Sequence, residues 1–345
     1  MLIGNWSTNP NITGIVWANI PGEQSGVSLV DVLYGAVNPG GKLPYTLGAT
    51  RSDYGTDLLY IPNEGIGGTP QQNFVEGNFI DYRAFDKHNI TPVYEFGFGL
   101  SYTTFSFSNL QITPVGHPAY QPTTGYTQPA PVLGSPGNAA DYVYPAGFRR
   151  LLDFIYPYIN STNLAASSGD PDYGQPSANY LPPYSQDGSA QPKNPAGGAP
   201  GGNPGLWDVF FEVTATVTNT GKVIGDEVPQ LYISLGAPTD PVRVLRNFDR
   251  LTIAPGQSAT FKAEITRRDI SNWDTVAQNW FISTYPKTVY VGSSSRNLPL
   301  SAPLPMQNIT GSKPGPCTTQ TYKWPHWGPT ATSWGKGWSA PTGWW

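Results

Sequence analysis

The sequence predicts an α+β chain of more than one domain, in which a mixed strand and helix region precedes an all-β sandwich. Near the start, an apolar run typical of a buried strand is followed by apolar residues at helical spacing. From residue 206 to residue 303, short runs of alternating apolar and polar residues follow one another. A chain of 345 residues is long enough for both regions.

The first region begins with the run TGIVWANI at residues 13–20, which is rich in β-branched and aromatic residues. Apolar residues from Val27 to Tyr34 then recur at helical spacing, and Gly35 is placed to end the helix. A second short strand is expected around residues 43–47. This order of strand, helix and strand is that of one βαβ-type unit.

Glu23 lies in the first turn of the predicted helix. It is either a catalytic carboxylate or only part of the helix start. The helix dipole stabilises a carboxylate at this position by about 0.3–1 kcal/mol, and the side chain of Gln24 or Ser25 can bond the free backbone N–H groups. The helix start explains Glu23 without any further partner, and we adopt that interpretation.

Residues 49–76 are typical of a loop, and residues 78–86 alternate apolar and polar side chains. The stretch VYEFGFGLSYTTFSFSNL at residues 93–110 predicts a strand with aromatic side chains on one face. Gly97 and Gly99 share its other face, which lets a neighbour approach closely. We expect another backbone segment there, with a sugar ring as the alternative.

Residues 111–205 are rich in proline and tyrosine and are expected to be an insertion or linker. One short helix within residues 146–162 would end at Pro157. We expect the insertion to wrap a surface or to stay mobile, without a core of its own.

Residues 206–303 predict a β-sandwich of the immunoglobulin or fibronectin type III kind. Every second residue from Val209 to Val217 is apolar, and turns are expected at residues 219–221 and at Pro255-Gly256. The tail from residue 304 to residue 345 is rich in tryptophan, glycine and proline without a helical or strand period. Disorder is expected there, although tryptophans can also stack on sugar rings.

Composition excludes several classes of function. The net charge of −4 and the scattered basic residues argue against nucleic-acid binding. No apolar run reaches the length of about 18 residues that a membrane span requires. Cys317 is the single cysteine, so it is either an unpaired thiol or a partner for another chain. His88, His117 and His326 are far apart, so neither a metal site nor a cofactor is expected.

The chain carries five sequons for N-glycosylation, which favour a secreted protein. Their acceptors are Asn5, Asn11, Asn89, Asn160 and Asn308. The N-terminus MLIGNWSTNP nevertheless has neither the basic nor the apolar region of a signal peptide. The two observations agree if the natural protein begins upstream, so we expect this chain to be a fragment.

Seven stretches, taken together, resemble the C-terminal part of the extracellular β-glucosidases of glycoside hydrolase family 3, in their filamentous-fungal form. They are NPNITGIVWANIPGEQSGVSLVDVLYGAVNPGGKLPYTLG, FIDYRAFD, PVYEFGFGLSYTTF, GDEVPQLYISLG, VLRNFDRL, TRRDISNWDTVAQNW and YVGSSSRNLPL. The stretches occur in the family's order, and the stretch FIYPYINSTNLAASSGDPDYG resembles an insertion found in some of those enzymes.

The resemblance implies an architecture for each part of the chain. Residues 1–110 correspond to the end of an α/β sandwich domain, residues 111–205 to the insertion, and residues 206–303 to a fibronectin type III-like domain. The barrel that opens these enzymes, and with it the aspartate nucleophile, has no counterpart here. The glutamate acid/base of the family lies upstream of anything that matches residues 1–22.

The resemblance therefore implies the C-terminal portion of a secreted β-glucosidase, which removes terminal β-D-glucose from cellobiose and other β-glucosides with retention. The substrate would bind through the missing barrel, and this chain would supply no catalytic residue. Among other carboxylates, neither Asp81 with Asp86 nor Glu64 with Glu76 predicts an active site, since an Asp beside an Arg usually forms a structural bond. The alternative is a stand-alone structural or carbohydrate-binding module without hydrolytic activity.

Overall fold

The computed structural model describes residues 3–60, 72–129, 189–198 and 202–306. The chain divides into two units, residues 1–311 and residues 312–345, and all described residues belong to the first. The expected helix within residues 146–162, Cys317 and most of the tryptophan-rich tail lie outside the described residues.

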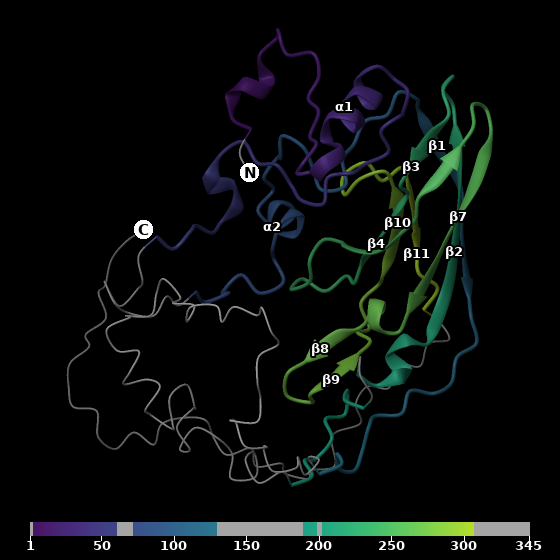
Figure 1. The fold of residues 1–345 in the computed structure, drawn as a ribbon. Helices are drawn as coiled ribbons and strands as arrows, with labels where there is room; N and C mark the ends of the chain where they lie inside the picture. The colour runs from purple at the N-terminus through teal and green to yellow at the C-terminus, as the bar shows by residue number, and fades with distance from the viewer. Residues whose placement is uncertain (1–2, 61–71, 130–188, 199–201, 307–345) are drawn as a thin grey trace, which may run out of the picture. The chain divides into compact units, whose positions relative to one another are not determined.

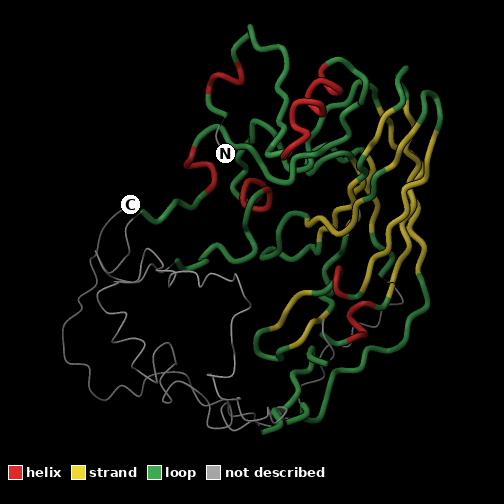
Figure 2. Tube along the Cα trace, viewed as in Figure 1, coloured by secondary structure: helices red, strands yellow, loops and turns green. Residues whose placement is uncertain are grey.

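The largest structured part is a β-sandwich of two antiparallel sheets (Figures 1 and 2). The first sheet has the order β1 (Phe105–Pro114), β2 (Val209–Asn219), β7 (Ser258–Thr266). The second has the order β11 (Leu300–Pro303), β10 (Thr288–Gly292), β4 (Gln230–Ser234), β5 (Val244–Phe248). Two short pairs complete it, β3 (Gly225–Glu227) with β6 (Leu251–Ile253) and β8 (Asn272–Asp274) with β9 (Asn279–Phe281).

The period-two pattern explains the core of the sandwich. Val213, Val217 and Phe261 are fully buried and pack in one cluster with Leu231 and Val289 of the opposite sheet. Each such side chain contributes about 1.5–3 kcal/mol through burial. The predicted sandwich and the alternating face of β2 are confirmed.

Strand β1 comes from the part of the chain that precedes the insertion. It pairs with β2 in a register that joins Phe105 to Asn219 and Pro114 to Phe211. The sandwich thus receives a strand that runs across residue 110, where the sequence suggested a domain boundary. The strand predicted over residues 93–110 includes the first part of β1, but only the pairing shows to which sheet it belongs.

The two ends of the insertion pair with each other, and we name residues 120–127 and 191–197 the stem. Backbone hydrogen bonds join Thr123 N–H to the carbonyl of Pro195 (2.9 Å) and Lys193 N–H to the carbonyl of Gly125 (2.8 Å). A further bridge joins Tyr126 to Pro192. These ends of the insertion are therefore ordered against one another.

Among its described residues, the region before β1 holds two short α-helices, α1 (Ser25–Leu33) and α2 (Tyr82–Lys87), and three 3-10 turns, η1 (Asn5–Thr8), η2 (Gly22–Gln24) and η3 (Arg51–Tyr54). The predicted helix is confirmed as α1, and Gly35 follows it with φ +78°. The expected side-chain cap is wrong, because neither Gln24 nor Ser25 bonds a free N–H of this helix start.

The strands predicted around this helix are wrong. Residues 13–20 form no strand, and residues 43–47 form only an isolated bridge between Leu47 and Tyr94. A strand requires neighbouring backbone to satisfy its N–H and C=O groups, and the described residues offer none beside residues 13–20. The strand expected over residues 93–110 forms only from residue 105 onward, as the first part of β1, since residues 93–104 turn and loop before it.

The glycines of that segment do allow the close approach that the sequence predicted. A side chain at Gly99 would collide with the carbonyl of Gly41, so backbone approaches there as expected. Gly97, which has φ +81°, instead faces the side chain of Gln230 from β4. The expected backbone neighbour is confirmed at Gly99 and is replaced by a side chain at Gly97.

These differences predict unequal protection of the backbone in the 345-residue chain. Amides of β2 and β10 should exchange with solvent slowly, because they lie in paired strands around a buried core. Amides of residues 13–20 should exchange within the first labelling times. Hydrogen exchange followed by mass spectrometry measures both, and equal protection of the two regions would contradict this assignment.

Candidate functional site: the junction before the β-sandwich

Asp86, near the end of α2, ties this helix to the sandwich. Its Oδ1 lies 3.1 Å from Nη2 of Arg296, and its Oδ2 lies 3.4 Å from Nε of Arg243. Arg243 immediately precedes β5, and Arg296 follows β10 and also donates to the carbonyl of Ile90 (2.8 Å). One buried carboxylate therefore holds two arginines from separate parts of the sandwich.

Burial raises the pKa of the Asp86 carboxyl above its usual range, and the charges of Arg243 and Arg296 act against that rise. A raised pKa means that the ionised carboxylate is less favourable in the folded chain than in the unfolded chain. A buried ion pair of this kind adds little net stability. We infer that its effect is to fix the position of α2 against the sandwich.

Tyr82, the first residue of α2, makes the second contact of this helix. Its hydroxyl accepts a hydrogen bond from the backbone N–H of Leu245 in β5 (2.9 Å). Its ring centre lies 4.8 Å from that of Phe96 and 6.0 Å from that of Tyr232, which meets it edge to face. Burial raises the pKa of both tyrosines, so both hydroxyls stay protonated at neutral pH.

Gln230 of β4 continues this buried network. Its Nε2 donates to the carbonyls of Gly97 (3.1 Å) and Ser293 (2.8 Å), and its Oε1 accepts from the hydroxyl of Tyr232 (2.6 Å). Every polar atom of the amide is used, as burial requires. The closeness of Gly97 follows from this bond, since a larger residue there would displace the glutamine.

A further set of polar contacts lies near the first turns of the sandwich. Lys42 forms a buried ion pair with Glu227 of β3 (2.9 Å) and donates to the carbonyl of Gly99 (3.2 Å). Asn219, at the end of β2, accepts from the hydroxyl of Thr103 (2.6 Å). These contacts and the Asp86 network form what we name the junction, the interface between residues 3–104 and the sandwich.

Asp226 of β3 borders the junction beside Gly40, where a Cβ would collide with it. Its carboxylate accepts from Thr252 Oγ1 (2.6 Å) and pairs with Arg250. The hydrogen bond from Thr252, and then the pairing with Arg250, hold the pKa of Asp226 below its usual value of 3.8.

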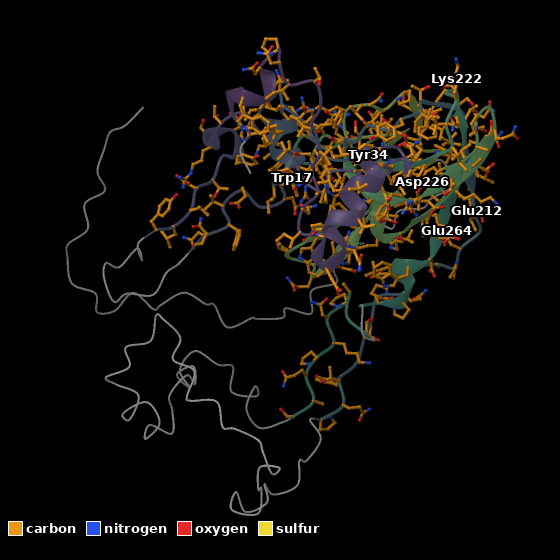
Figure 3. The ribbon with its side chains drawn as sticks, turned by 45° about the horizontal axis from the view of Figure 1, so that its top comes forward. Trp17, Tyr34, Glu212, Lys222, Asp226 and Glu264 are labelled. Carbon is orange, nitrogen blue, oxygen red and sulfur yellow. The ribbon has the colours of Figure 1, made fainter. Side chains whose placement is uncertain are left out.

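Helix α1 differs from the buried polar contacts of the junction, because it has an exposed apolar surface. The helix has no buried residue, and its apolar side chains include Val27 (61% exposed) and Leu33 (55% exposed). Ile20, before the helix, and Tyr34, after it, are also exposed. Figure 3 shows Trp17 and Tyr34 beside this helix. A helix face of this kind is normally covered in a folded protein.

Family models match both sides of the junction. The model for the glycosyl hydrolase family 3 C-terminal domain matches residues 1–102, and that for the fibronectin type III-like domain matches residues 227–295. Residues 1–102 are therefore a C-terminal domain of glycoside hydrolase family 3. The sequence-based recognition of the family and the α+β fold class are thereby confirmed.

Curated relatives and solved structures agree with these matches. Over 305 residues, 88% of this chain, it is 57% identical to a probable beta-glucosidase A of Aspergillus terreus and 56% identical to beta-glucosidase A of Aspergillus kawachii. A solved family 3 beta-glucosidase of Neurospora crassa shares 57% identity at a TM-score of 0.73, covering 88% of this chain and 36% of that one. A Chaetomium thermophilum beta-glucosidase shares 53% identity at a TM-score of 0.72, with the same coverage.

The chain spans 35% of the length of the curated relatives it matches. Because the two family models match either side of the junction, it joins a family 3 C-terminal domain to a fibronectin type III-like domain. Asp86 lies in the first matched range and Arg243 in the second, which places the ion pair across the two.

Of the carboxylates considered from sequence, Asp81 and Asp86 take structural positions. Asp81 accepts from the N–H (2.8 Å) and the hydroxyl (3.2 Å) of Thr46, and so holds the start of α2. Asp86 does pair with arginine, but with two distant ones rather than with the nearby Arg83. Glu23 lies exposed in η2, directly before α1, as the helix-start interpretation expected. Glu64 lies outside the described residues.

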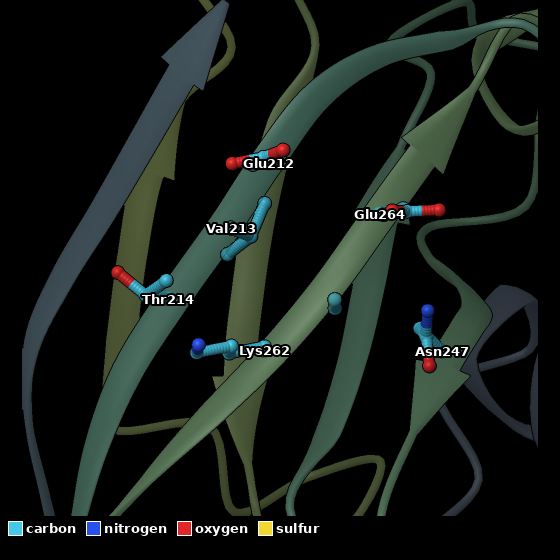
Figure 4. Close-up of a pocket in the computed structure, with 7 residues that line it drawn as sticks. Glu212, Val213, Thr214, Asn247, Lys262 and Glu264 are labelled. Carbon is cyan, nitrogen blue, oxygen red and sulfur yellow. The ribbon is translucent and has the colours of Figure 1, made fainter.

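Sequence reasoning missed one pair of neighbouring carboxylates. Glu212 of β2 and Glu264 of β7 are cross-strand partners and line a pocket of about 510 Å³ with Lys262 and Asn247 (Figure 4). A retaining glycosidase needs one carboxyl kept protonated by its surroundings and another that is ionised. Both glutamates are exposed on the outer face of the sheet, so neither lies in a site closed off from water.

The described residues also bear on the sequons and on metal binding. Asn11 and Asn89 are exposed, Asn5 lies in η1, and Asn160 and Asn308 fall outside the described ranges. Within those ranges, no group of three or more His, Cys, Asp or Glu side chains is placed to hold a metal ion. A search of the same residues finds no helix of the length and apolar character that a membrane span needs.

The junction predicts the effect of removing one partner of Asp86. The R243M variant leaves a buried carboxylate with one arginine, and we expect it to lower the free energy of unfolding by about 3 kcal/mol at neutral pH. The deficit should shrink in acid, because the pKa of Asp86 rises further and the protonated carboxyl has no charge to compensate. Urea unfolding at several pH values measures this.

K222M, at an exposed site labelled in Figure 3, is the control and should leave the unfolding midpoint unchanged. An R243M variant as stable as the unmodified chain would show that the pair does not hold α2.

Replacement of Asp226 should change the stability of the chain with a different pH dependence. Its pKa is lowered on folding, so the stability it contributes is present above its usual value of 3.8 and is lost as the pH falls through the lowered value. D226N should therefore be less stable than the unmodified chain at neutral pH and equal to it in strong acid. Thermal unfolding across this range measures the difference. D31N, on α1, is the control, and a D226N deficit independent of pH would contradict the assignment.

Proposed function

We propose that this chain is the C-terminal portion of a β-glucosidase that removes terminal non-reducing β-D-glucosyl residues from cellobiose and other β-glucosides with retention. In this proposal the chain braces the enzyme and supplies neither catalytic carboxylate. The observation that carries it is the 57% identity to proteins named beta-glucosidase, of which the chain spans 35%.

The arrangement of the carboxylates supports the absence of a catalytic pair. Retention requires two carboxyl groups about 5–5.5 Å apart on opposite sides of the sugar, with different protonation states. Asp81, Asp86 and Glu227 are each engaged by hydrogen bonds or ion pairs that hold the fold. Glu212 and Glu264 both lie exposed on an open strand surface. The remainder of the enzyme would provide the catalytic pair.

The exposed face of α1 supports a bracing role. Its apolar side chains, with Ile20 and Trp17, suit coverage by the preceding elements of the same α/β layer in the longer protein. Burial of such a patch against those elements would fasten them to the junction, and through Asp86 and Gln230 to the sandwich. The substrate would then bind in the part of the enzyme that this chain braces.

The alternative function is a stand-alone, non-catalytic module. The observation that favours it is that the sandwich core and the junction are completed by residues of this chain alone. The exposed α1 face argues against it, because a stand-alone module has no further layer to cover that face.

Assay of the 345-residue chain on an aryl β-glucoside tests the catalytic part of the proposal. We expect no turnover above background, and no aspartate or glutamate labelled by a fluorosugar inactivator. Either turnover or a labelled residue would contradict the absence of a catalytic pair.

Fusion of this chain to the preceding part of the Aspergillus terreus relative tests the bracing part. The chimera should hydrolyse the glucoside, and a matched truncation that ends before this chain should not. An inactive but folded chimera would favour the stand-alone module.

We also propose that the protein is extracellular and carries N-linked glycans at its sequons. Exposure of Asn11 and Asn89 supports them as acceptors, since each side chain is accessible to the transferase. Asn5, Asn160 and Asn308 are proposed on their sequons alone.

A further inference from the structure

The β8–β9 hairpin presents two tryptophans on one face. Trp273 and Trp280 are direct cross-strand partners, which places their side chains on the same side of the hairpin. Their ring centres lie 5.3 Å apart with planes at 63°. The paired strands thus hold two large rings in a defined relation to each other.

Neighbouring groups fix these rings. The guanidinium of Arg268 lies 3.5 Å from the ring centre of Trp280, within cation–π distance. At the turn, the Asp274 carboxylate accepts from the N–H groups of Val276 (2.8 Å) and Ala277 (3.0 Å). A surface that is ordered before a ligand arrives has less conformational entropy to lose on binding.

The stem supports the hairpin from two positions. Asn194 donates to Oε1 of Gln278 at the turn (3.1 Å), and the hydroxyl of Tyr120 donates to Oδ1 of Asn279 (2.9 Å). The ring of Tyr120 also lies 4.0 Å from the guanidinium of the buried Arg267. The hairpin is therefore anchored to the two ends of the insertion.

Trp273 remains accessible in this ordered setting. It is 37% exposed, whereas the core rings Phe211 and Phe261 are fully buried. Within the described part of the chain, the indole N–H groups of Trp273 and Trp280 have no hydrogen-bond partner, and neither nitrogen is a buried unsatisfied atom. Tryptophan N–H groups usually find a partner when buried, so these donors are open to solvent or to a ligand.

A pyranose ring matches these groups. Its C–H face can lie on an exposed indole ring, while its hydroxyls accept from indole N–H and guanidinium donors. A whole aromatic side chain buries about 150–250 Å², and Trp273 exposes only 37% of its surface. The surface is thus well below the roughly 800 Å² per partner of a stable protein interface. The size of the surface therefore favours a small, uncharged, hydroxyl-rich ligand over a protein.

We propose that Trp273, with Trp280 and Arg268, forms a binding site for a β-glucosyl ring. The choice of β-glucosyl sugar rests on the proposed function, whereas the binding surface itself rests on the hairpin. A single exposed ring implies weak binding, with a Kd of about 1 mM.

Titration of the 345-residue chain with cellotetraose tests this site, since the proposed lack of a catalytic pair leaves the sugar intact. Isothermal calorimetry should give a Kd of about 1 mM, and the indole N–H resonance of Trp273 should shift in a nitrogen–proton NMR spectrum. Maltotetraose, the α-linked counterpart, should bind more weakly. Absence of both heat and resonance shift would overturn the proposal.

Variants assign the binding to the hairpin. W273A should weaken it by at least about tenfold, and W273F should retain part of it, because an aromatic face remains. W207A removes another exposed tryptophan outside the hairpin and should bind as the unmodified chain does. Equal affinity of W273A and the unmodified chain would overturn the site.

The two proposals fail independently of each other. Thermal unfolding of W273A shows whether the variant is folded, and the resonance shift in the unmodified chain stands even where that variant does not fold. An inactive chimera with intact cellotetraose binding would remove the proposed β-glucosidase function but keep the site. An active chimera without such binding would do the reverse.

Discussion

Strand β2 is the element on which the rest of the described structure depends, because its backbone pairs on both sides. One ladder joins it to β7 within the sandwich, and the other joins it to β1, which arrives from before the insertion. The second ladder brings residues separated by the whole insertion into one sheet. Asn219, at the end of β2, extends this link through the hydroxyl of Thr103 and the carbonyls of Val223 and Ile253.

The junction uses buried polar groups where the sandwich uses apolar ones. Gln230 and Tyr82 satisfy backbone groups of segments that have no regular ladder, which explains why residues 94–104 stay ordered without being a strand. Asp86 fixes the position of α2, because Arg243 and Arg296 come from different parts of the sandwich and both contact its carboxylate. Net stability from such groups is small, but leaving one of them unpaired is costly. The junction is thus specific without being strongly stabilising.

Helix α1 and the β8–β9 hairpin both expose aromatic or apolar side chains, yet in different ways. The surface of α1 is composed of aliphatic residues beside an extended segment without strand partners, which suits coverage by more of the same protein. The hairpin exposes one ordered tryptophan, and the indole N–H groups of its two tryptophans have no hydrogen-bond partner among the described residues, which suits a small ligand. The bracing role and the sugar site are consequently assigned to opposite kinds of surface.

The sequence by itself determined the sandwich, helix α1 and the family, because these depend on local period and on matching motifs. The alternation from Val209 to Val217 needs no distant partner to be recognised. Only the tertiary structure decided that residues 13–20 form no strand, that β1 pairs with β2, and that Asp86 meets Arg243 and Arg296. Each of these outcomes depends on which backbone or charge lies nearby in space, and one sequence does not contain that information.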